Sequence, residues 1–260
     1  MSESRSIDMS VEVPGSPEEV WDAIATGPGI GSWFTPTEVD GHVGGQVTMD
    51  FGSFGTQTAT VTAWEPPRRL VFQSGGERPL AYEWLVEARA GGSCIVRLVN
   101  SGFGTGEDWD GDYDGMSEGW NILLPNLRLQ LTHFRGRRAQ AFIPTVTIPG
   151  PNAAAWSTLC EALGLPTSLG TGDRLATGAD VPGLAGTVER TIATAKATAY
   201  LLLVDEPGPG TGFVAAEGDG DQVAASVYLY LYDPDDHDAG REWTSWLTAR
   251  FQALQGNLAD

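Results

Sequence analysis

The sequence predicts an α+β protein in which one order of strands and helices occurs twice. Two stretches carry the repeat, VEVPGSPEEVW from Val11 and VTIPGPNAAAW from Val146, and both place Pro-Gly after alternating apolar residues and end on Trp. Each is followed by strand-like runs between glycine and proline turns, and then by an amphipathic helix rich in aromatic residues. The matching order favours duplication over chance. We therefore predict two domains, residues 1–138 and 139–260.

The composition limits the partners of the protein. Its 260 residues suffice for one large or two ordinary domains. The 34 acidic residues outnumber the 15 basic ones and give a net charge of −19. Nucleic acids and anionic membrane surfaces bind through lysine and arginine, which are scarce here. We therefore expect neither of them as a partner.

The sequence contains no sign of a leader, a cofactor site or a catalytic motif. The N-terminal MSESRSIDMS has no apolar core, and no run approaches the roughly 18 apolar residues of a membrane span, so we predict a cytoplasmic protein without membrane insertion. Cys94 and Cys160 lie too far apart for a metal knuckle and are predicted to be core thiols. The three histidines accompany no nucleophile motif. We predict no catalytic residue, no metal and no cofactor.

The chain begins with a strand followed by a helix. Residues 7–13 alternate as a strand, and Pro14-Gly15 ends it. Ser16 is a good N-cap, Pro17 suits the first helical position, and the acidic residues that follow favour the positive end of the helix dipole. This helix is predicted to end near Gly27, and a short helix is predicted after it.

A series of antiparallel strands follows. Glycine and proline turns separate the runs 46–51, 56–64, 69–74, 81–88 and 93–101. Glu83 and Glu87 face water in the fourth run, so the side chains between and beside them point inward. The same alternation gives one inward set: Val47, Met49, Phe51, Tyr82, Trp84, Val86, Cys94, Val96 and Leu98.

A long helix ends the first half, after an acidic loop predicted at 104–115. Apolar residues recur at helical spacing in one stripe: Met116, Trp120, Leu123, Leu127, Leu131 and Phe134. Pro125 lies inside this pattern and is predicted to kink the helix.

The acidic loop partly fits a calcium-binding pattern. Asp110, Asp112 and Asp114 precede Gly115 as in D-x-D-x-D-G, but Asn121 stands where that pattern needs a bidentate glutamate. No helix precedes the loop. We therefore interpret the acids as a solvated helix start that Asp114 caps.

The second half repeats the order with weaker signals. Strands are predicted at 142–148, 187–194, 198–204, 211–216 and 223–232. A helix is predicted at 152–163, and the segment DPDDHDAGREWTSWLTARF is predicted to be an acidic loop that leads into a last aromatic helix.

Four stretches of the first half resemble one superfamily. They are VPGSPEEVWDAIAT at 13–26, GSWFTP at 31–36, WEPPRRLVF at 64–72 and YDGMSEGWNILLPNLRLQL at 113–131. In this order they are similar to the START-like (SRPBCC, Bet v 1-like) helix-grip superfamily, in particular the branch named for homology to the activator of heat-shock protein 90 ATPase. The second half lacks a counterpart of GSWFTP, and we interpret it as a diverged, shorter second copy.

The resemblance implies a curved antiparallel sheet wrapped around the long C-terminal helix, with a cavity between sheet and helix. Together with the repeat, it predicts two tandem lobes of this fold, with the cavity in the first. The predicted inner faces support this shape, since they must enclose either a lined pocket or a dense core. Thr48 and Asn100 are polar candidates on the inner face. The predicted ligand-binding residues are Trp33, Phe34, Phe51, Phe54, Tyr82, Trp84, Tyr113, Met116, Trp120, Leu123, Leu124 and Leu127. The alternative is that these side chains form an ordinary core.

We therefore expect the first lobe to bind a small hydrophobic or amphipathic molecule. Two other functions stay open. One is a cyclase or hydrolase acting on polyketide- or lipid-like substrates, which needs a positioned acid or base of tuned pKa. The other is a chaperone-linked protein-interaction module, which needs a large exposed apolar patch. A homodimer or a protein partner is also left open.

Overall fold

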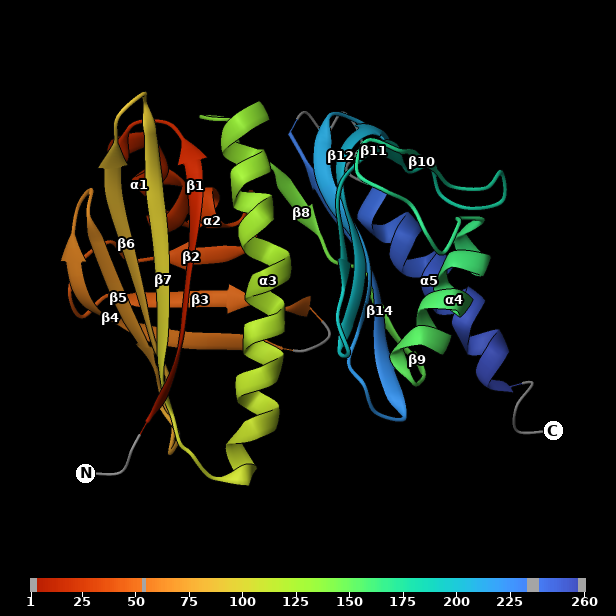
Figure 1. Cartoon of the computed structure of the whole chain (residues 1–260), viewed down its shortest axis with the longest axis horizontal. Coiled ribbons are helices and arrows are strands. Elements are labelled where there is room, and N and C mark those ends of the chain that lie inside the picture. Colours follow the sequence, from red (N-terminus) through yellow and green to blue (C-terminus); the bar gives the residue numbers. More distant parts are fainter. Residues whose placement is uncertain (1–3, 53–54, 233–238, 257–260) are drawn as a thin grey trace. The chain divides into compact units, whose positions relative to one another are not determined.

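The chain folds into two compact units, Met1–Arg138 and Ala139–Asp260 (Figure 1). This computed structural model describes the whole chain except residues 1–3, 53–54, 233–238 and 257–260. Each unit is an α+β domain with its own antiparallel sheet and its own hydrophobic core.

The first unit has a seven-stranded sheet in the order β1-β7-β6-β5-β4-β3-β2. Its strands are β1 (Arg5–Pro14), β2 (Thr37–Val39), β3 (Gln46–Asp50), β4 (Thr56–Glu65), β5 (Arg69–Ser74), β6 (Ala81–Arg89) and β7 (Ser93–Phe103). Its helices are α1 (Pro17–Ala25), α2 (Gly27–Ile30), a 3₁₀ turn (Glu107–Trp109) and α3 (Asp110–His133). The predicted strands and helices are present, and each neighbouring pair of strands is antiparallel.

The short helix predicted after the first helix is present as α2, and the short strand β2 is absent from the sequence prediction. Helix α2 follows α1 directly because the Thr26 hydroxyl accepts from the Gly29 N–H (3.1 Å) and starts a new turn. Gly27 permits this helix to lie against β2, since a Cβ there would stand 2.4 Å from the Thr37 carbonyl oxygen.

The start of α1 is a capping box. The Ser16 hydroxyl accepts from the Glu19 N–H (3.3 Å), and the Ser16 N–H donates to Glu19 Oε2 (2.8 Å). The Gly15 N–H donates to the Gly92 carbonyl (2.9 Å), which ties the Pro-Gly corner to the β6–β7 turn. The predicted N-cap is confirmed.

The predicted acidic loop is wrong in its second half. Helix α3 begins at Asp110, so Asp112 and Asp114 lie inside it, and Trp109 rather than Asp114 is its N-cap. Residues two apart on a helix point to nearly opposite sides, so Asp112 points away from Asp110 and Asp114, which removes the calcium-loop geometry. The helix continues on both sides of Pro125.

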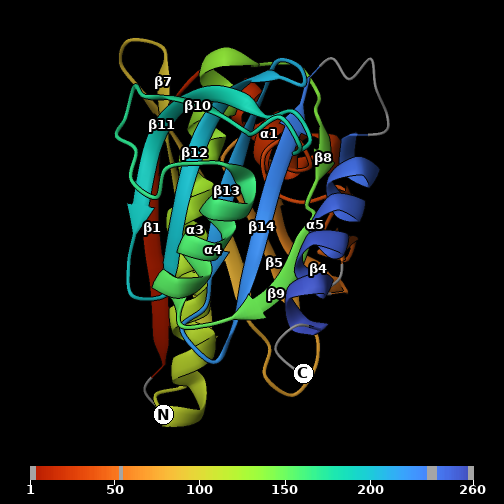
Figure 2. The ribbon, with the colours of Figure 1, turned by 90° about the vertical axis from the view of Figure 1, so that its right-hand side faces the viewer.

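The second unit has a seven-stranded sheet in the order β10-β11-β12-β13-β14-β8, with β9 also paired to β14. Its strands are β8 (Gln140–Phe142), β9 (Thr145–Pro149), β10 (Arg174–Ala176), β11 (Ala185–Ala193), β12 (Ala197–Glu206), β13 (Gly210–Glu217) and β14 (Gln222–Leu231). Helices α4 (Asn152–Leu163) and α5 (Ala239–Gly256) cover one face of this sheet (Figure 2).

One strand predicted for the second unit is two separate strands in the structure. The run 142–148 is broken into β8 and β9 around Pro144, which has no N–H for the ladder. The Pro144 carbonyl still accepts from the Val227 N–H (3.0 Å).

The two units share one topology. In each, the strand that runs into the Pro-Gly corner pairs antiparallel with the last strand of the meander, β1 with β7 and β9 with β14. The Gly150 N–H donates to the Asp221 carbonyl (2.9 Å) at the β13–β14 turn, as the Gly15 N–H does to the β6–β7 turn. Both repeated tryptophans are buried, Trp21 against Trp64 and Trp156 against Tyr200. The repeat in the sequence thus corresponds to a repeat in the structure.

We expect Ser16→Ala to lower the free energy of unfolding by about 1 kcal/mol, because the Glu19 N–H loses its acceptor. Urea denaturation followed by tryptophan fluorescence measures the change. Ser4→Ala is the control, since Ser4 is exposed and precedes β1. Equal stability of the two variants would contradict the capping role.

The same box predicts a dependence on pH. The pKa of the Glu19 carboxyl lies below its ordinary value of 4.5, chiefly because the Ser16 N–H donates to it and also because the Arg135 guanidinium is near. A lowered folded pKa gives stability that is complete above the unfolded pKa and is lost as the pH falls through the folded pKa. Wild type should therefore exceed Glu19→Gln in urea midpoint at pH 7, and the difference should shrink below pH 4.5. A difference in urea midpoint that stays the same at all pH values would contradict this role of the Glu19 carboxylate.

Candidate ligand-binding site

The site is built on the inner face of the first unit's sheet, against α3 (Figure 1). Tyr82, Trp84 and Val86 are 7%, 3% and 6% exposed, as the alternation of β6 predicts. From α3 the core contains Trp120, Leu124, Leu127 and Leu131, while Met116 and Leu123 are partly buried against it. The predicted stripe therefore faces the predicted side of the sheet.

The middle of this interface is filled by aromatic rings. Trp120 packs on Trp84 and Phe34 with centroids 5.5 and 5.3 Å apart, and Trp33 lies 5.9 Å from Trp84. Phe51 lies 5.7 Å from Phe34. We call these five residues the aromatic cluster. It leaves the GSWFTP side of the interface occupied by side chains.

Hydrogen bonds hold one edge of the aromatic cluster in place. Trp33 is 1% exposed, and its Nε1–H donates to the Ala23 carbonyl (2.9 Å). Asn126, buried on α3, donates from Nδ2 to the Trp33 carbonyl (2.8 Å). These contacts fix the loop after α2 against α3, so the cluster is part of the structural core.

The remaining predicted residues have separate places. Leu123, Leu124 and Leu127 pack in the core from α3. Tyr113 packs its ring on Phe103 (5.3 Å), and its hydroxyl donates to the Ser6 carbonyl (3.4 Å). Phe54 lies outside the described residues.

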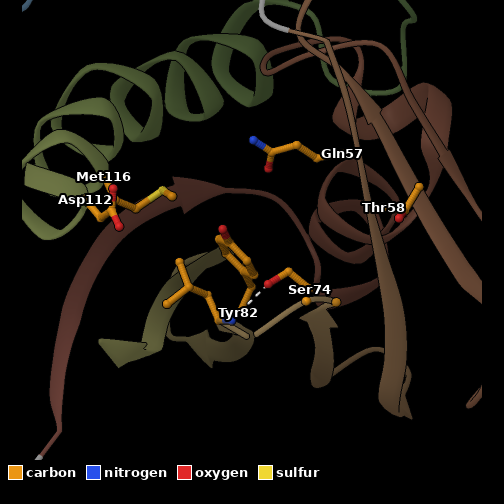
Figure 3. Close-up of a pocket in the computed structure, with 9 residues that line it drawn as sticks. Gln57, Thr58, Ser74, Tyr82, Asp112 and Met116 are labelled. Atoms are coloured by element: carbon orange, nitrogen blue, oxygen red, sulfur yellow. Dashed lines mark hydrogen bonds between the residues drawn. The ribbon is translucent and has the colours of Figure 1, made fainter. Parts of the chain in front are cut away.

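A pocket of about 560 Å³ opens beside the aromatic cluster, between β4, the β5–β6 hairpin and the first turns of α3 (Figure 3). Of the predicted residues, Tyr82 and Met116 line it. Tyr82 lies two residues before Trp84 on β6, and Met116 lies one helical turn before Trp120 on α3. The full lining is Gln57, Thr58, Ser74, Gly75, Gly76, Leu80, Tyr82, Asp112 and Met116.

The polar part of this lining is absent from the sequence prediction. Alternation along β4 places Gln57 on the same face as the buried Ala59 and Val61, and this signal was available. Ser74 needs the β4–β5 register as well, which pairs it with Ala59. Asp112 needs the earlier start of α3.

The pocket floor carries an unpaired hydroxyl. Tyr82 stacks on Phe72 (5.0 Å between centroids, 18° between planes), which fixes its ring. Its hydroxyl has no hydrogen-bond partner among the described residues, although Ser74 Oγ nearby accepts from the Leu80 N–H (2.9 Å). Burial raises the pKa of the Tyr82 phenol to about 12. It is therefore protonated at neutral pH and can donate a hydrogen bond.

An arginine connects the two sides of the pocket. Arg78, in the β5–β6 hairpin, places its guanidinium 3.6 Å from the Trp109 ring centroid. The same group lies 3.2 Å from an Asp112 carboxylate oxygen and 3.8 Å from one of Asp108, and it donates to the Asp108 carbonyl (3.0 Å). We call this set of contacts the Arg78 clasp. It ties the hairpin to the start of α3.

The two polar candidates on the inner face behave differently. Asn100 is fully buried beside Tyr82 in the β6–β7 register, and its Oδ1 has no described partner. Thr48 alternates with the core residues Val47 and Met49, so it faces the other side of the sheet and its inward placement is wrong.

Both cysteines are buried free thiols, as predicted. Burial raises the pKa of the Cys160 thiol to about 12. Within the described ranges, no group of three or more histidine, cysteine, aspartate or glutamate side chains is arranged to hold a metal ion.

Comparison with known families agrees with this architecture. Residues 4–132 match the family described as polyketide cyclase/dehydrase and lipid transport. The first unit is a START-like helix-grip domain. The match runs from β1 to the last turn of α3, so it includes every residue of the pocket lining. The resemblance inferred from the four sequence stretches is confirmed for this START-like domain.

Several solved structures are similar to the chain. Protein MLL2253 from Mesorhizobium loti is 20% identical, covers 50% of this chain and 98% of its own, and has a TM-score of 0.46. DynU16, a protein of the dynemicin biosynthetic locus, is 17% identical and covers 98% of this chain and 99% of its own, with a TM-score of 0.45. The Aha1 dimer from Colwellia psychrerythraea is 22% identical and covers 51% and 99%, with a TM-score of 0.44. No curated protein matches the chain in sequence.

We expect Trp120→Ala to lower the free energy of unfolding by about 3–5 kcal/mol, since it removes a 4% exposed ring from the aromatic cluster. Trp120→Phe keeps a ring against Trp84 and Phe34, and the Trp120 Nε1–H has no described partner to lose. It should therefore cost clearly less. Urea denaturation of both variants tests this, and equal costs would contradict the packing role.

Proposed function

We propose that the START-like domain, residues 1–138, binds a small hydrophobic or amphipathic molecule in the pocket between its sheet and α3. The observation that supports this is the pocket itself. Its volume of about 560 Å³ falls in the range of ordinary small-molecule sites, and Leu80, Tyr82 and Met116 offer apolar contact. Burying apolar ligand surface there contributes about 25 cal/mol per Å². The polar rim, with Gln57 and Ser74, suits an amphipathic occupant.

The family match supports the same proposal, because its description includes lipid transport. In the second unit, α4 and α5 pack their apolar residues directly on the sheet in one buried cluster. We interpret this unit, residues 139–260, as a diverged copy, and we assign the binding role to the first.

A cyclase-type activity is the second candidate, since the family description also names polyketide cyclases and dehydrases. Such chemistry needs an acid or base whose pKa lies near the working pH. The titratable side chains in the lining are Tyr82 and Asp112. Burial raises the pKa of Tyr82 to about 12, so it can donate a hydrogen bond but is a poor base at neutral pH. Binding without turnover is therefore the better supported function.

No specific observation favours the protein-interaction module. Among the described residues, Val43 is the exposed large hydrophobic side chain, which is too little for a docking patch. In that same part of the chain, no helix combines the length and apolar character of a membrane span. A cytoplasmic location and a homodimer stay predictions.

We expect Met116→Trp to fill the pocket and to weaken binding of any retained molecule by at least about tenfold, since the larger ring occupies the space above Tyr82. Asn121→Trp, on an exposed position of α3, is the matched control and should bind normally. Native mass spectrometry and thermal shifts with a panel of lipids and aromatic polyketides measure binding and reveal any turnover. Absence of any bound molecule in wild type would refute the proposal.

A further inference from the structure

We infer that the pocket takes an uncharged aromatic molecule bearing a carbonyl or similar hydrogen-bond acceptor, and that the Tyr82 hydroxyl donates to that acceptor. This inference rests on the proposed binding function and specifies its ligand class. Three observations carry it: a phenol hydroxyl that opens into the pocket and has no partner among the described residues, the aromatic ring and thioether surfaces beside it, and the sign of the charge at the rim.

The Tyr82 hydroxyl is built into the site as a donor. The residue is 7% exposed, and its oxygen points into the pocket, toward the space between Met116 and Gln57 (Figure 3). The hydroxyl oxygen is not among the fully enclosed polar atoms, so it is open to the pocket, and it has no hydrogen-bond partner among the described residues. Burial keeps the phenol protonated at neutral pH by raising its pKa. An acceptor atom on the ligand completes its hydrogen bonding.

The surfaces beside the hydroxyl suit a planar body. Tyr82 cannot turn freely because its ring is stacked on Phe72. Met116 extends from α3 toward the same space, and a thioether makes favourable contacts with aromatic rings. A ring placed between the Met116 side chain and the sheet therefore presents its edge substituents to the Tyr82 hydroxyl.

The charge around the pocket excludes anions. Asp112 is the charged residue of the lining. The nearby Arg78 is shared between Asp108 and Asp112, and Arg5 is paired with Asp110. Each guanidinium is thus already matched by at least one carboxylate. A carboxylate or sulfonate on the ligand would meet the Asp112 carboxylate, while both of these nearby guanidinium groups of the described chain are already paired with carboxylates, which is unfavourable.

The first test uses 6-propionyl-2-dimethylaminonaphthalene, an uncharged naphthyl ketone whose emission shifts to the red when its carbonyl accepts a hydrogen bond. Wild type should bind it, and Met116→Trp should not. Tyr82→Phe keeps the stack on Phe72 and should bind it roughly three- to tenfold more weakly, the loss expected for one hydrogen bond, with emission shifted to the blue. An unchanged emission maximum in Tyr82→Phe would overturn the role of the hydroxyl, because a merely structural effect would not move it selectively.

The second test uses two dyes that differ by one sulfonate, N-phenyl-1-naphthylamine and 8-anilino-1-naphthalenesulfonate, each displaced by the ketone. The uncharged dye should bind at least about tenfold more tightly. Asp112→Asn should raise the affinity of the sulfonate relative to that of the uncharged dye, because only the sulfonate carries a charge that the Asp112 carboxylate repels. Tight sulfonate binding that Met116→Trp abolishes would overturn the charge selection.

The outcomes separate the inference from the function on which it rests. If neither the ketone nor the uncharged dye binds wild type, both fail. If they bind in a manner that Met116→Trp blocks but Tyr82→Phe and Asp112→Asn have no effect, binding stands and the ligand class is wrong. Circular dichroism and thermal midpoints close to those of wild type show that each variant is folded.

Discussion

The packing of one helix on one sheet face determines the architecture of the first unit. The apolar stripe of α3 meets the inward side chains of a sheet whose strands all pair antiparallel, and Trp120 against Trp84 is the central contact. Because both rings are large and almost fully buried, they set the distance between helix and sheet at this point. At this level the rings of the aromatic cluster fill the space between helix and sheet. The pocket begins one helical turn earlier on α3, at the level of Met116.

The pocket is therefore a consequence of graded side-chain size along two elements. On α3 the sequence passes from Met116 to Trp120, and on β6 it passes from Tyr82 to Trp84. The polar residues Gln57 and Ser74 take inner-face positions on the neighbouring strands at the same level. The pocket lies at the level of Tyr82 and Met116, and its lining includes both apolar and polar side chains.

Much of the fold was predictable from local patterns. Period-two alternation placed Tyr82 and Trp84 inward, and the capping signal at Ser16 fixed the start of α1. The runs 69–74 and 152–163 agree with the observed bounds of β5 and α4. Alternation reads each element separately, however, so it does not show how much space is left between two inward faces. That space depends on the helix–sheet distance, which Trp120 and Trp84 set together.

The candidate site was predictable in part for the same reason. Tyr82 and Met116 belong to the inward sets, and both line the pocket, whereas Trp33 and Phe34 have the same sequence character and pack in the aromatic cluster. The start of α3 was misplaced because glycine and aspartate disfavour helix, and contacts with Arg5 and Arg78 from distant segments override that preference. Such long-range ion pairs leave no periodic signal.

The Arg78 clasp holds the β5–β6 hairpin against α3 through two kinds of contact that respond differently to salt. Its guanidinium must leave the Trp109 face and the Asp108 and Asp112 carboxylates before the β5–β6 hairpin can move away from α3. Both ion pairs are largely exposed, so dissolved ions weaken them while the contact with the indole persists. Higher ionic strength therefore weakens the part of the clasp made by the ion pairs, while the contact between Arg78 and the indole of Trp109 continues to hold the hairpin to α3.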